Sequence, residues 1–131
     1  MKRILITTGD PDGVGSEVTF KALSDIGPQT NIQFVAWRSP ICPPSHIRML
    51  DRKFNRLTLG ADEAWPISDS KTLIDIVSES PPARWVESAV HLCLKNKAAA
   101  LVTAPLSKTG ISTAGLRDRG HTEILRRLCK S

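Results

Sequence analysis

Tyrosine is absent from this sequence, and aromatic residues make up only 5% of its 131 residues. No apolar run approaches the roughly 20 residues that a membrane-spanning helix needs, and no low-complexity tract is present. The cysteines include no C-x-x-C pair, so we expect reduced thiols rather than a disulfide framework or a zinc site. We therefore expect a globular cytoplasmic protein with no membrane partner. The cysteines are Cys42, Cys93 and Cys129.

Acidic residues are scarce in the last third of the chain, where only Asp118 and Glu123 follow His91. The formal net charge is +5, and a basic surface suits an anionic partner such as a phosphorylated metabolite or nucleic acid. A solvated face, or a face covered by other protein, fits the same charge. Because the chain has no aromatic stacking platform and no recognition motif, we do not expect nucleic acid as a partner.

Clusters of metal-ligating or nucleophilic residues are also missing from the sequence. His46, His91 and His121 are isolated from one another, and no serine lies in a nucleophile elbow. The residues alone therefore predict no resident metal and no catalytic residue in this chain.

A strand, a helix and a second strand are predicted within the first 37 residues. Arg3–Thr7 and Ile32–Trp37 are short apolar runs typical of buried parallel strands. Between them, Ser16–Gly27 has helical spacing, with Ser16 as the expected N-cap and Gly27 closing the helix. The order is that of a βαβ unit. Apolar residues recur in this helix at Val18, Ala22 and Ile26.

The rest of the chain continues the alternation of strands and helices. Ser45 is expected to cap a short helix that runs to Leu50, and 56–60 and 73–77 are expected to be extended. A helix is predicted within 81–97 and a buried strand within 98–105. We therefore predict one α/β unit with a parallel sheet.

The loop of residues 7–17, "TTGDPDGVGSE", follows the first predicted strand. In open α/β sheets, ligands bind at such positions. Gly9, Gly13 and Gly15 allow backbone N–H groups to approach an anion, whereas Asp10 would repel a nearby phosphate. Neither a dinucleotide fingerprint nor a P-loop matches. Ligand contact and a tight turn therefore remain equal alternatives.

A second loop follows the strand predicted within 98–105. Lys108 can pair with a phosphate or a carboxylate as a point charge. His121 and Thr122 open the last predicted helix, whose first N–H groups can receive an anion. The helix dipole favours a neutral His121. A cap or a buried histidine is the alternative for His121, but together the three residues favour a polar-ligand site.

Taken in order, the motifs "ITTGDPDGVGSE", "LVTAPLSK" and "AGLRDRGHTE" resemble the 4-hydroxythreonine-4-phosphate dehydrogenase family of pyridoxal phosphate biosynthesis. The family's patterns are close to T-x-G-D-P-x-G-I-G-P-E, V-T-A-P-[IL]-N-K and G-H-T-E. The chain departs from them at Ser16, Ser107 and Arg119. Arg119, beside the G-H-T-E box, raises the alternative of a paralogue that acts on a related acid.

The resemblance implies a three-layer α/β/α fold of the isocitrate/isopropylmalate dehydrogenase type, in a homodimer. It also implies an NAD- or NADP-dependent oxidation of 4-phosphohydroxy-L-threonine, followed by loss of CO2 to give 3-amino-2-oxopropyl phosphate. By the resemblance, His121 and Thr122 bind this phosphorylated substrate. A divalent metal (Zn, Mg or Co) would be held by three histidines downstream of the box, and this chain contains none of them.

We accordingly expect residues 1–131 to be the N-terminal segment of a two-domain dehydrogenase, with an incomplete fold. The metal-binding part and most of the nucleotide-binding part would be absent, so we expect the chain alone to be inactive. Whether it acts as an enzyme is left open. The alternative is a non-catalytic protein that binds a phosphorylated metabolite or serves in assembly.

Overall fold

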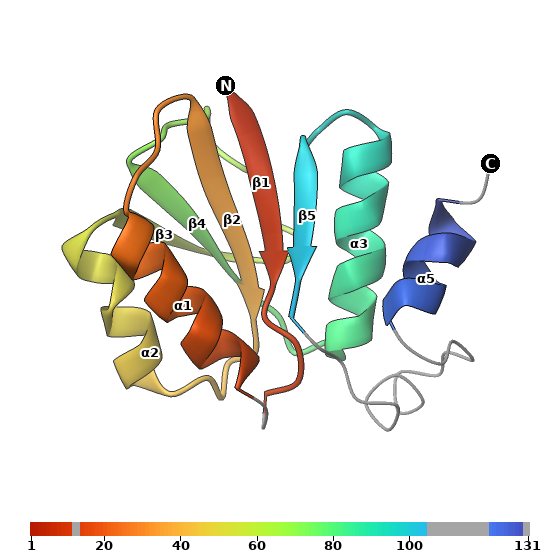
Figure 1. The fold of residues 1–131 in the computed structure, drawn as a ribbon, viewed down its shortest axis with the longest axis horizontal. Coiled ribbons are helices and arrows are strands. Elements are labelled where there is room, and N and C mark those ends of the chain that lie inside the picture. The colour runs from red at the N-terminus through yellow and green to blue at the C-terminus, as the bar shows by residue number, and fades with distance from the viewer. Residues whose placement is uncertain (12–13, 105–120, 130–131) are drawn as a thin grey trace.

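The computed structural model describes residues 1–11, 14–104 and 121–129. Within them, parallel strands form a five-stranded sheet in the order β3-β4-β2-β1-β5 (Figure 1). Every pair of neighbouring strands is parallel, as predicted. The strands are β1 (Lys2–Thr7), β2 (Ile32–Arg38), β3 (Asn55–Gly60), β4 (Thr72–Val77) and β5 (Ala100–Thr103).

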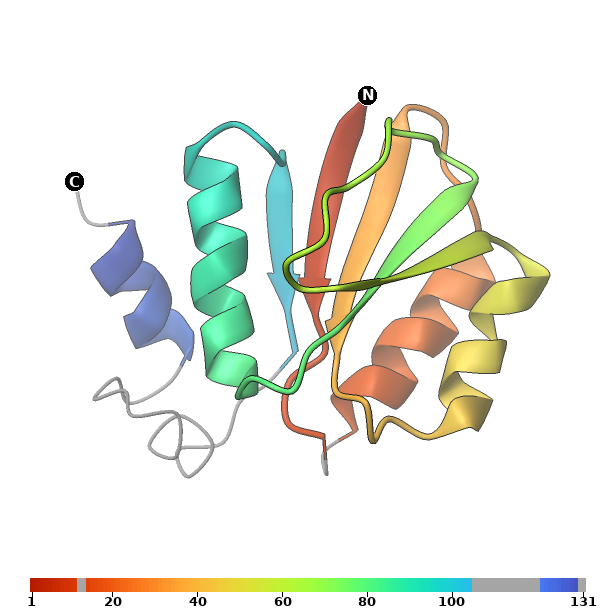
Figure 2. The same ribbon diagram turned by 180° about the vertical axis from the view of Figure 1, so that it is seen from behind.

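Helices separate the strands along the chain except between β3 and β4, which follow each other directly. The helices cover both faces of the sheet (Figures 1 and 2). The three-layer α/β arrangement predicted for the chain is therefore confirmed. The helices are α1 (Gly15–Ile26), α2 (Pro44–Arg48), the 3-10 helix η1 (Leu50–Arg52), α3 (Pro82–Leu94) and α5 (His121–Leu128).

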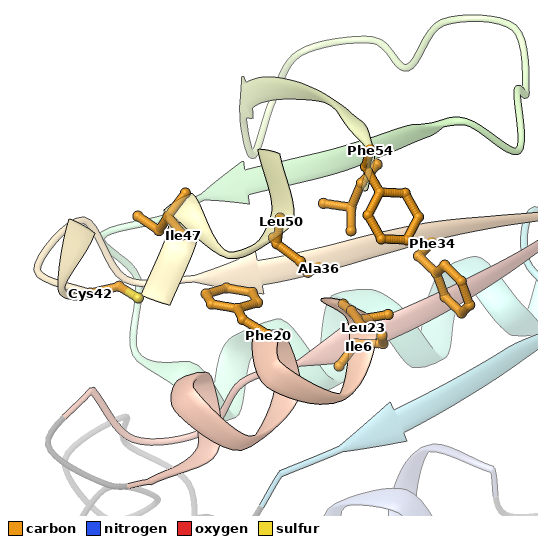
Figure 3. Packing of buried hydrophobic residues seen from close by; sticks show 10 residues of the cluster. Ile6, Phe20, Leu23, Phe34, Ala36, Cys42, Ile47, Leu50 and Phe54 are labelled. Atoms are coloured by element: carbon orange, nitrogen blue, oxygen red, sulfur yellow. The ribbon is translucent and has the colours of Figure 1, made fainter. Parts of the chain in front are cut away.

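One face of the sheet is covered by α1, α2 and η1. Phe20 and Leu23 of α1 pack against Phe34 and Ala36 of β2, and Leu50 of η1 closes this layer (Figure 3). Phe34 and Phe54 meet edge to face, with ring centroids 6.1 Å apart. Such pairs add about 0.5–1.5 kcal/mol beyond the area that they bury. This cluster fixes α1 above β2.

The other face is covered by α3, which α5 extends. Trp85 and Ala89 of α3 pack on Leu5, Val35 and Ile74 of the sheet, as the helical spacing in 81–97 predicts. Further round α3, Val86 and Val90 contact Ile124 of α5, which is fully buried. The order of packing is thus sheet, α3 and α5, as Figure 2 shows from behind.

Two predicted helix caps are wrong. The N-cap of α1 is Val14, with no side-chain hydrogen bond, and Ser16 lies buried inside the first turn. The N-cap of α2 is Pro43 rather than Ser45. In both cases the helix begins before the serine that the sequence favoured. Gly27 does close α1, with φ 63° and its N–H donating to the Leu23 carbonyl.

The apolar residues that recur at helical spacing in α1 do not face the core. Val18 is 60% exposed and Ile26 is 53% exposed, and Ala22 between them is exposed as well. The helix is held instead through Phe20 and Leu23, which lie on an adjoining face. The recurrence of Val18, Ala22 and Ile26 therefore marks the helix but not the face that it buries.

Candidate functional site

The two loops that the sequence indicates begin side by side. In the β1–β5 pair, Thr7 lies opposite Thr103, and the Ala104 N–H donates to the Thr7 carbonyl at 2.9 Å. From this edge the chain turns to α1 on one face after β1, and reaches α5 on the other face after β5 (Figure 1). In open α/β sheets, ligands bind at such a switch point. We call the edge where these strands end the carboxyl edge.

Gly15 lets the start of α1 lie against this edge. A Cβ placed on Gly15 would lie 2.0 Å from the Thr8 carbonyl oxygen and 2.8 Å from the Ala104 Cβ. No side chain fits there without displacing the helix or the strand ends. Gly15 is therefore required by the close approach of three segments, which brings the first turn of α1 to the junction of β1 and β5.

Gly9 serves the turn that follows β1. Its φ is 77°, a left-handed conformation that glycine adopts at little cost. Just before it, buried Thr8 donates from Oγ1 to the Trp37 carbonyl at 2.8 Å, and its N–H reaches the same oxygen at 3.2 Å. Asp10 follows, half-buried. For Gly9, the tight-turn alternative is thus confirmed, and ligand contact by Gly9 and Asp10 stays a prediction.

The predicted last helix begins at His121, so His121 and Thr122 occupy the first two positions of α5. In both ribbon views, this end of α5 lies on the same side of the molecule as the carboxyl edge (Figures 1 and 2). The first turns of α1 and α3 lie there too. Each presents the positive end of a helix dipole, and the first turn of α1 carries N–H groups without intrahelical partners. In α3, Pro82 has no N–H and the Arg84 N–H donates to the Pro81 carbonyl at 2.8 Å. The arrangement suits an anion.

An ion pair adds to the apolar contact that holds α5 on α3. Arg127 donates to Glu87 at 2.9 Å, and Arg84 donates to the other oxygen of Glu87 at 2.7 Å. Burial raises the pKa of Glu87, but the hydrogen bonds from Arg127 and Arg84 outweigh burial, so the pKa is lowered overall. The position of His121 thus depends on α3.

Four of the predicted site positions lie wholly or partly outside the described residues. Gly13 and Lys108 lie outside the described ranges, and for His121 and Thr122 only the backbone is described. The structure therefore brings together Gly9, Asp10 and Gly15 at one edge. It places the start of α5 on the same side of the molecule as that edge.

A polar cluster that the sequence did not indicate lies beside the first turn of α1. The Ser16 hydroxyl and His46 Nδ1 are 3.3 Å apart, and the buried Cys42 thiol is next to Ser16. Burial raises the pKa of Cys42, and the hydrogen bond with Ser16 lowers it less. The thiol is therefore held protonated, which does not suit a nucleophile.

A buried ion-pair network crosses β2, β4 and β3. Arg38 binds Asp75 through two hydrogen bonds of 2.7 and 3.0 Å, and Arg56 reaches the same carboxylate at 2.9 Å. Arg56 also binds Asp51, which is the main cause of its raised pKa. Because Asp75 is satisfied within the protein, the network is structural. The aspartate within the apolar run "LIDIV" was the available signal for it.

A groove of about 750 Å³ lies on the α3 face, away from the predicted residues. Its lining includes Arg3, Trp37, Trp65 and Trp85. Arg3 lies over the Trp65 ring, 5.1 Å from the centroid. Among the described residues, the buried Trp85 Nε1 has no hydrogen-bond partner. The groove borders none of the described positions among the predicted site residues, so we assign it no part in their chemistry.

The described residues do not fit a divalent metal. No three His, Cys, Asp or Glu side chains among them come together at a spacing that could hold an ion. We therefore derive no step through a metal. Over the same part of the chain, no helix is long and apolar enough to cross a membrane.

Comparison with known proteins bears out the resemblance that the motifs indicate. Residues 74–131 match the family model of the pyridoxal phosphate biosynthetic protein PdxA. A 4-hydroxythreonine-4-phosphate dehydrogenase of Synechococcus sp. is 32% identical, over 98% of this chain and 40% of the relative. A D-threonate 4-phosphate dehydrogenase of Salmonella typhimurium is also 32% identical, over 99% of this chain and 45% of the relative.

The fold has a counterpart among solved structures. A 4-hydroxythreonine-4-phosphate dehydrogenase from Burkholderia phymatum aligns with a TM-score of 0.66 and 22% identity, over 98% of this chain and 43% of that one. At this identity the likeness concerns the fold alone. The chain thus spans less than half the length of the relatives that it matches.

Proposed function

We propose that this chain forms the substrate-binding edge of a dehydrogenase fold similar to the 4-hydroxythreonine-4-phosphate dehydrogenases. The names of both curated relatives specify a four-carbon hydroxy acid phosphorylated at carbon 4. We therefore take that class as the ligand of this chain, with 4-phosphohydroxy-L-threonine first and D-threonate 4-phosphate as the alternative that Arg119 prompts. The pathway would be the biosynthesis of pyridoxal phosphate.

The observation that carries the proposal is the convergence at the carboxyl edge. Gly15 seats the first turn of α1 on the ends of β1 and β5, and α5 begins on the same side of the molecule. An anionic ligand there would accept hydrogen bonds from free N–H groups in the first turns of the helices. Thr122 would add a hydroxyl, and Lys108 a point charge.

His121 would bind the ligand as a neutral imidazole. A position in the first turn of a helix disfavours the imidazolium, because the dipole is positive there. A neutral ring donates one hydrogen bond and accepts another, which suits the hydroxyl group of the acid. The residues of this chain would thus bind and orient the substrate. We propose no role for these residues in the oxidation itself, which would use NAD or NADP and a metal.

We expect the 131-residue protein to bind the substrate without turning it over. Titration calorimetry with 4-phosphohydroxy-L-threonine is expected to show binding, and 4-hydroxy-L-threonine, which lacks only the phosphoryl group, is expected to bind much less. His121→Gln and Thr122→Val should weaken binding at least tenfold. His91→Gln on α3 is the matched control and should not change it.

Reduction of NAD or NADP, measured by absorbance with Mg2+ or Zn2+ present, is expected to be absent. Turnover would contradict the inactive state that we propose for the chain alone. Equal binding of 4-hydroxy-L-threonine would contradict the phosphate site. Sedimentation under the same conditions tests the homodimer that the resemblance implies.

A further inference from the structure

Two cysteines lie at the ends of the two helices that cover the α3 face. Cys93 is half-buried in the last turn of α3, and Cys129 directly follows α5 and is exposed. Cys129 continues the helical hydrogen bonding, because its N–H donates to the Leu125 carbonyl at 2.9 Å. Both are free thiols, and neither takes part in the ligand site proposed above.

Cys93 extends the stripe of α3 that packs on α5. Val86 and Val90 of that stripe contact Ile124 of α5. Positions 86, 90 and 93 have the spacing that places residues on one face of a helix. Cys93 also packs against the cluster beneath α3. It therefore lies where the sheet-facing and the α5-facing sides of α3 meet.

Cys129 stands in the same relation to α5. Leu125 and Leu128 pack against the cluster that joins the two helices, and Cys129 follows Leu125 by four residues, on the same face. The two helices lie side by side, and both begin on the side of the carboxyl edge, so they run in the same direction (Figures 1 and 2). The two thiols thus lie at matching ends of helices that pack together.

The two thiols are also close enough to affect each other electrostatically. Burial raises the pKa of Cys93, and the charge of Cys129 raises it further. Packed helices have axes about 8–10 Å apart, and each Cα lies about 2.3 Å from its axis, so Cα atoms on facing stripes come within the roughly 4.4–6.8 Å that a disulfide needs.

We propose that Cys93 and Cys129 form a reversible disulfide that fastens the end of α5 to α3 under oxidising conditions. With a peroxide as oxidant, the exposed Cys129 thiolate attacks one oxygen and the O–O bond breaks, which gives a sulfenic acid and a hydroxide that takes up the thiol proton. Cys93 then attacks the Cys129 sulfur. The S–S bond forms, and the hydroxyl group leaves with the Cys93 proton as water. Two thiols thereby reduce one peroxide to two waters.

The disulfide would change how firmly α5 is held. In the reduced protein, apolar contact and the pair between Arg127 and Glu87 hold the helix on α3. A covalent link between positions 93 and 129 also restricts the unfolded chain, so α5 should separate from α3 less often. This inference does not depend on the acid at the carboxyl edge. Loss of acid binding would leave it standing, and absence of the disulfide would leave the ligand site standing.

The experiment oxidises the 131-residue protein with hydrogen peroxide and counts its thiols in denaturant. The count should fall from three per chain to one, and the chain should lose the mass of two hydrogen atoms. A tryptic digest should contain a peptide that links 85–95 to 128–130. Dithiothreitol should restore all three thiols. In the oxidised protein, hydrogen exchange of the amides in 122–129 should slow at least tenfold.

Cys93→Ser and Cys129→Ser should each abolish the linked peptide. The matched control is Cys42→Ser, because Cys42 is buried in the cluster on the opposite face of the sheet. It should leave the linked peptide unchanged, and circular dichroism should show that every variant is folded.

The proposal is overturned if peroxide leaves all three thiols free, or if it oxidises Cys129 without linking it to Cys93. A covalent dimer on a non-reducing gel that persists in Cys93→Ser would also overturn it, because Cys129 would then pair with a second chain. A disulfide that leaves the exchange in 122–129 unchanged would show that it does not fasten α5.

Discussion

Replacement of Gly15 by alanine tests whether the close approach at the carboxyl edge is real. In most helices this change stabilises, because alanine exceeds glycine in helix propensity by about 1 kcal/mol. Here the new Cβ would lie 2.0 Å from the Thr8 carbonyl oxygen, and separations under 3.0 Å are essentially never seen. The helix or the strand ends must therefore move by about an ångström.

Forced overpacking of this kind typically costs about 1–3 kcal/mol. Because backbone atoms are involved on the Thr8 side, we place the cost at or above the upper end of that range. After the gain in helix propensity is subtracted, the free energy of unfolding should fall by about 2 kcal/mol or more. That is a large share of the roughly 5–15 kcal/mol typical of a domain.

Urea denaturation followed by tryptophan fluorescence measures this change. Gly60→Ala is the control, since a Cβ there would lie 3.6 Å from Glu63 Oε1, an ordinary contact. The expected result is a clear loss for Gly15→Ala and little change for Gly60→Ala. If the two variants are equally stable, the first turn of α1 does not lie on the strand ends, and the segments do not converge at the carboxyl edge.

Three further predictions follow from buried or paired groups. Asp75→Asn should destabilise the protein by about 3–5 kcal/mol in urea denaturation, because it leaves Arg38, which is 7% exposed, without its charge partner; unchanged stability would contradict the network. With a thiol-reactive dye at pH 8, the exposed Cys129 should react first and the buried Cys42, whose pKa burial raises, last; the reverse order would contradict the burial of Cys42. The pKa of Glu87 is lowered in the folded protein from its ordinary 4.5, so its contribution to stability is present above pH 4.5 and lost as the pH falls through the folded pKa. Glu87→Gln should therefore be less stable than the wild type at pH 7, with the difference vanishing near pH 2, and a constant difference would count against the ion pair.

The alternation of strands and helices could be predicted from the sequence because it is a local signal. The run at 3–7 and the helical spacing in 81–97 each reflect burial against a continuous sheet, which the period of apolar residues reports directly. The residues of the G-H-T-E box likewise predicted the start of α5 from the local sequence alone. These elements lie within a few residues of their expected bounds.

What could not be predicted depends on the order of strands in space. The spacing of Val18, Ala22 and Ile26 identifies a stripe, but it does not say whether anything covers it. That depends on β5, some eighty residues further along the chain, being an edge strand. In the same way, Asp75 signalled a buried charge, but its partners Arg38 and Arg56 follow only from the pairing of β4 with β2 and β3.

The central claim is that a phosphorylated hydroxy acid binds at the carboxyl edge, and chemical-shift mapping tests it most directly. Backbone amide spectra of the 15N-labelled 131-residue protein would be recorded during titration with 4-phosphohydroxy-L-threonine. Shifts are expected in residues 8–15 and at His121 and Thr122, saturating together. Shifts confined to the groove on the α3 face, around Trp65 and Trp85, or no shifts at all, would contradict it.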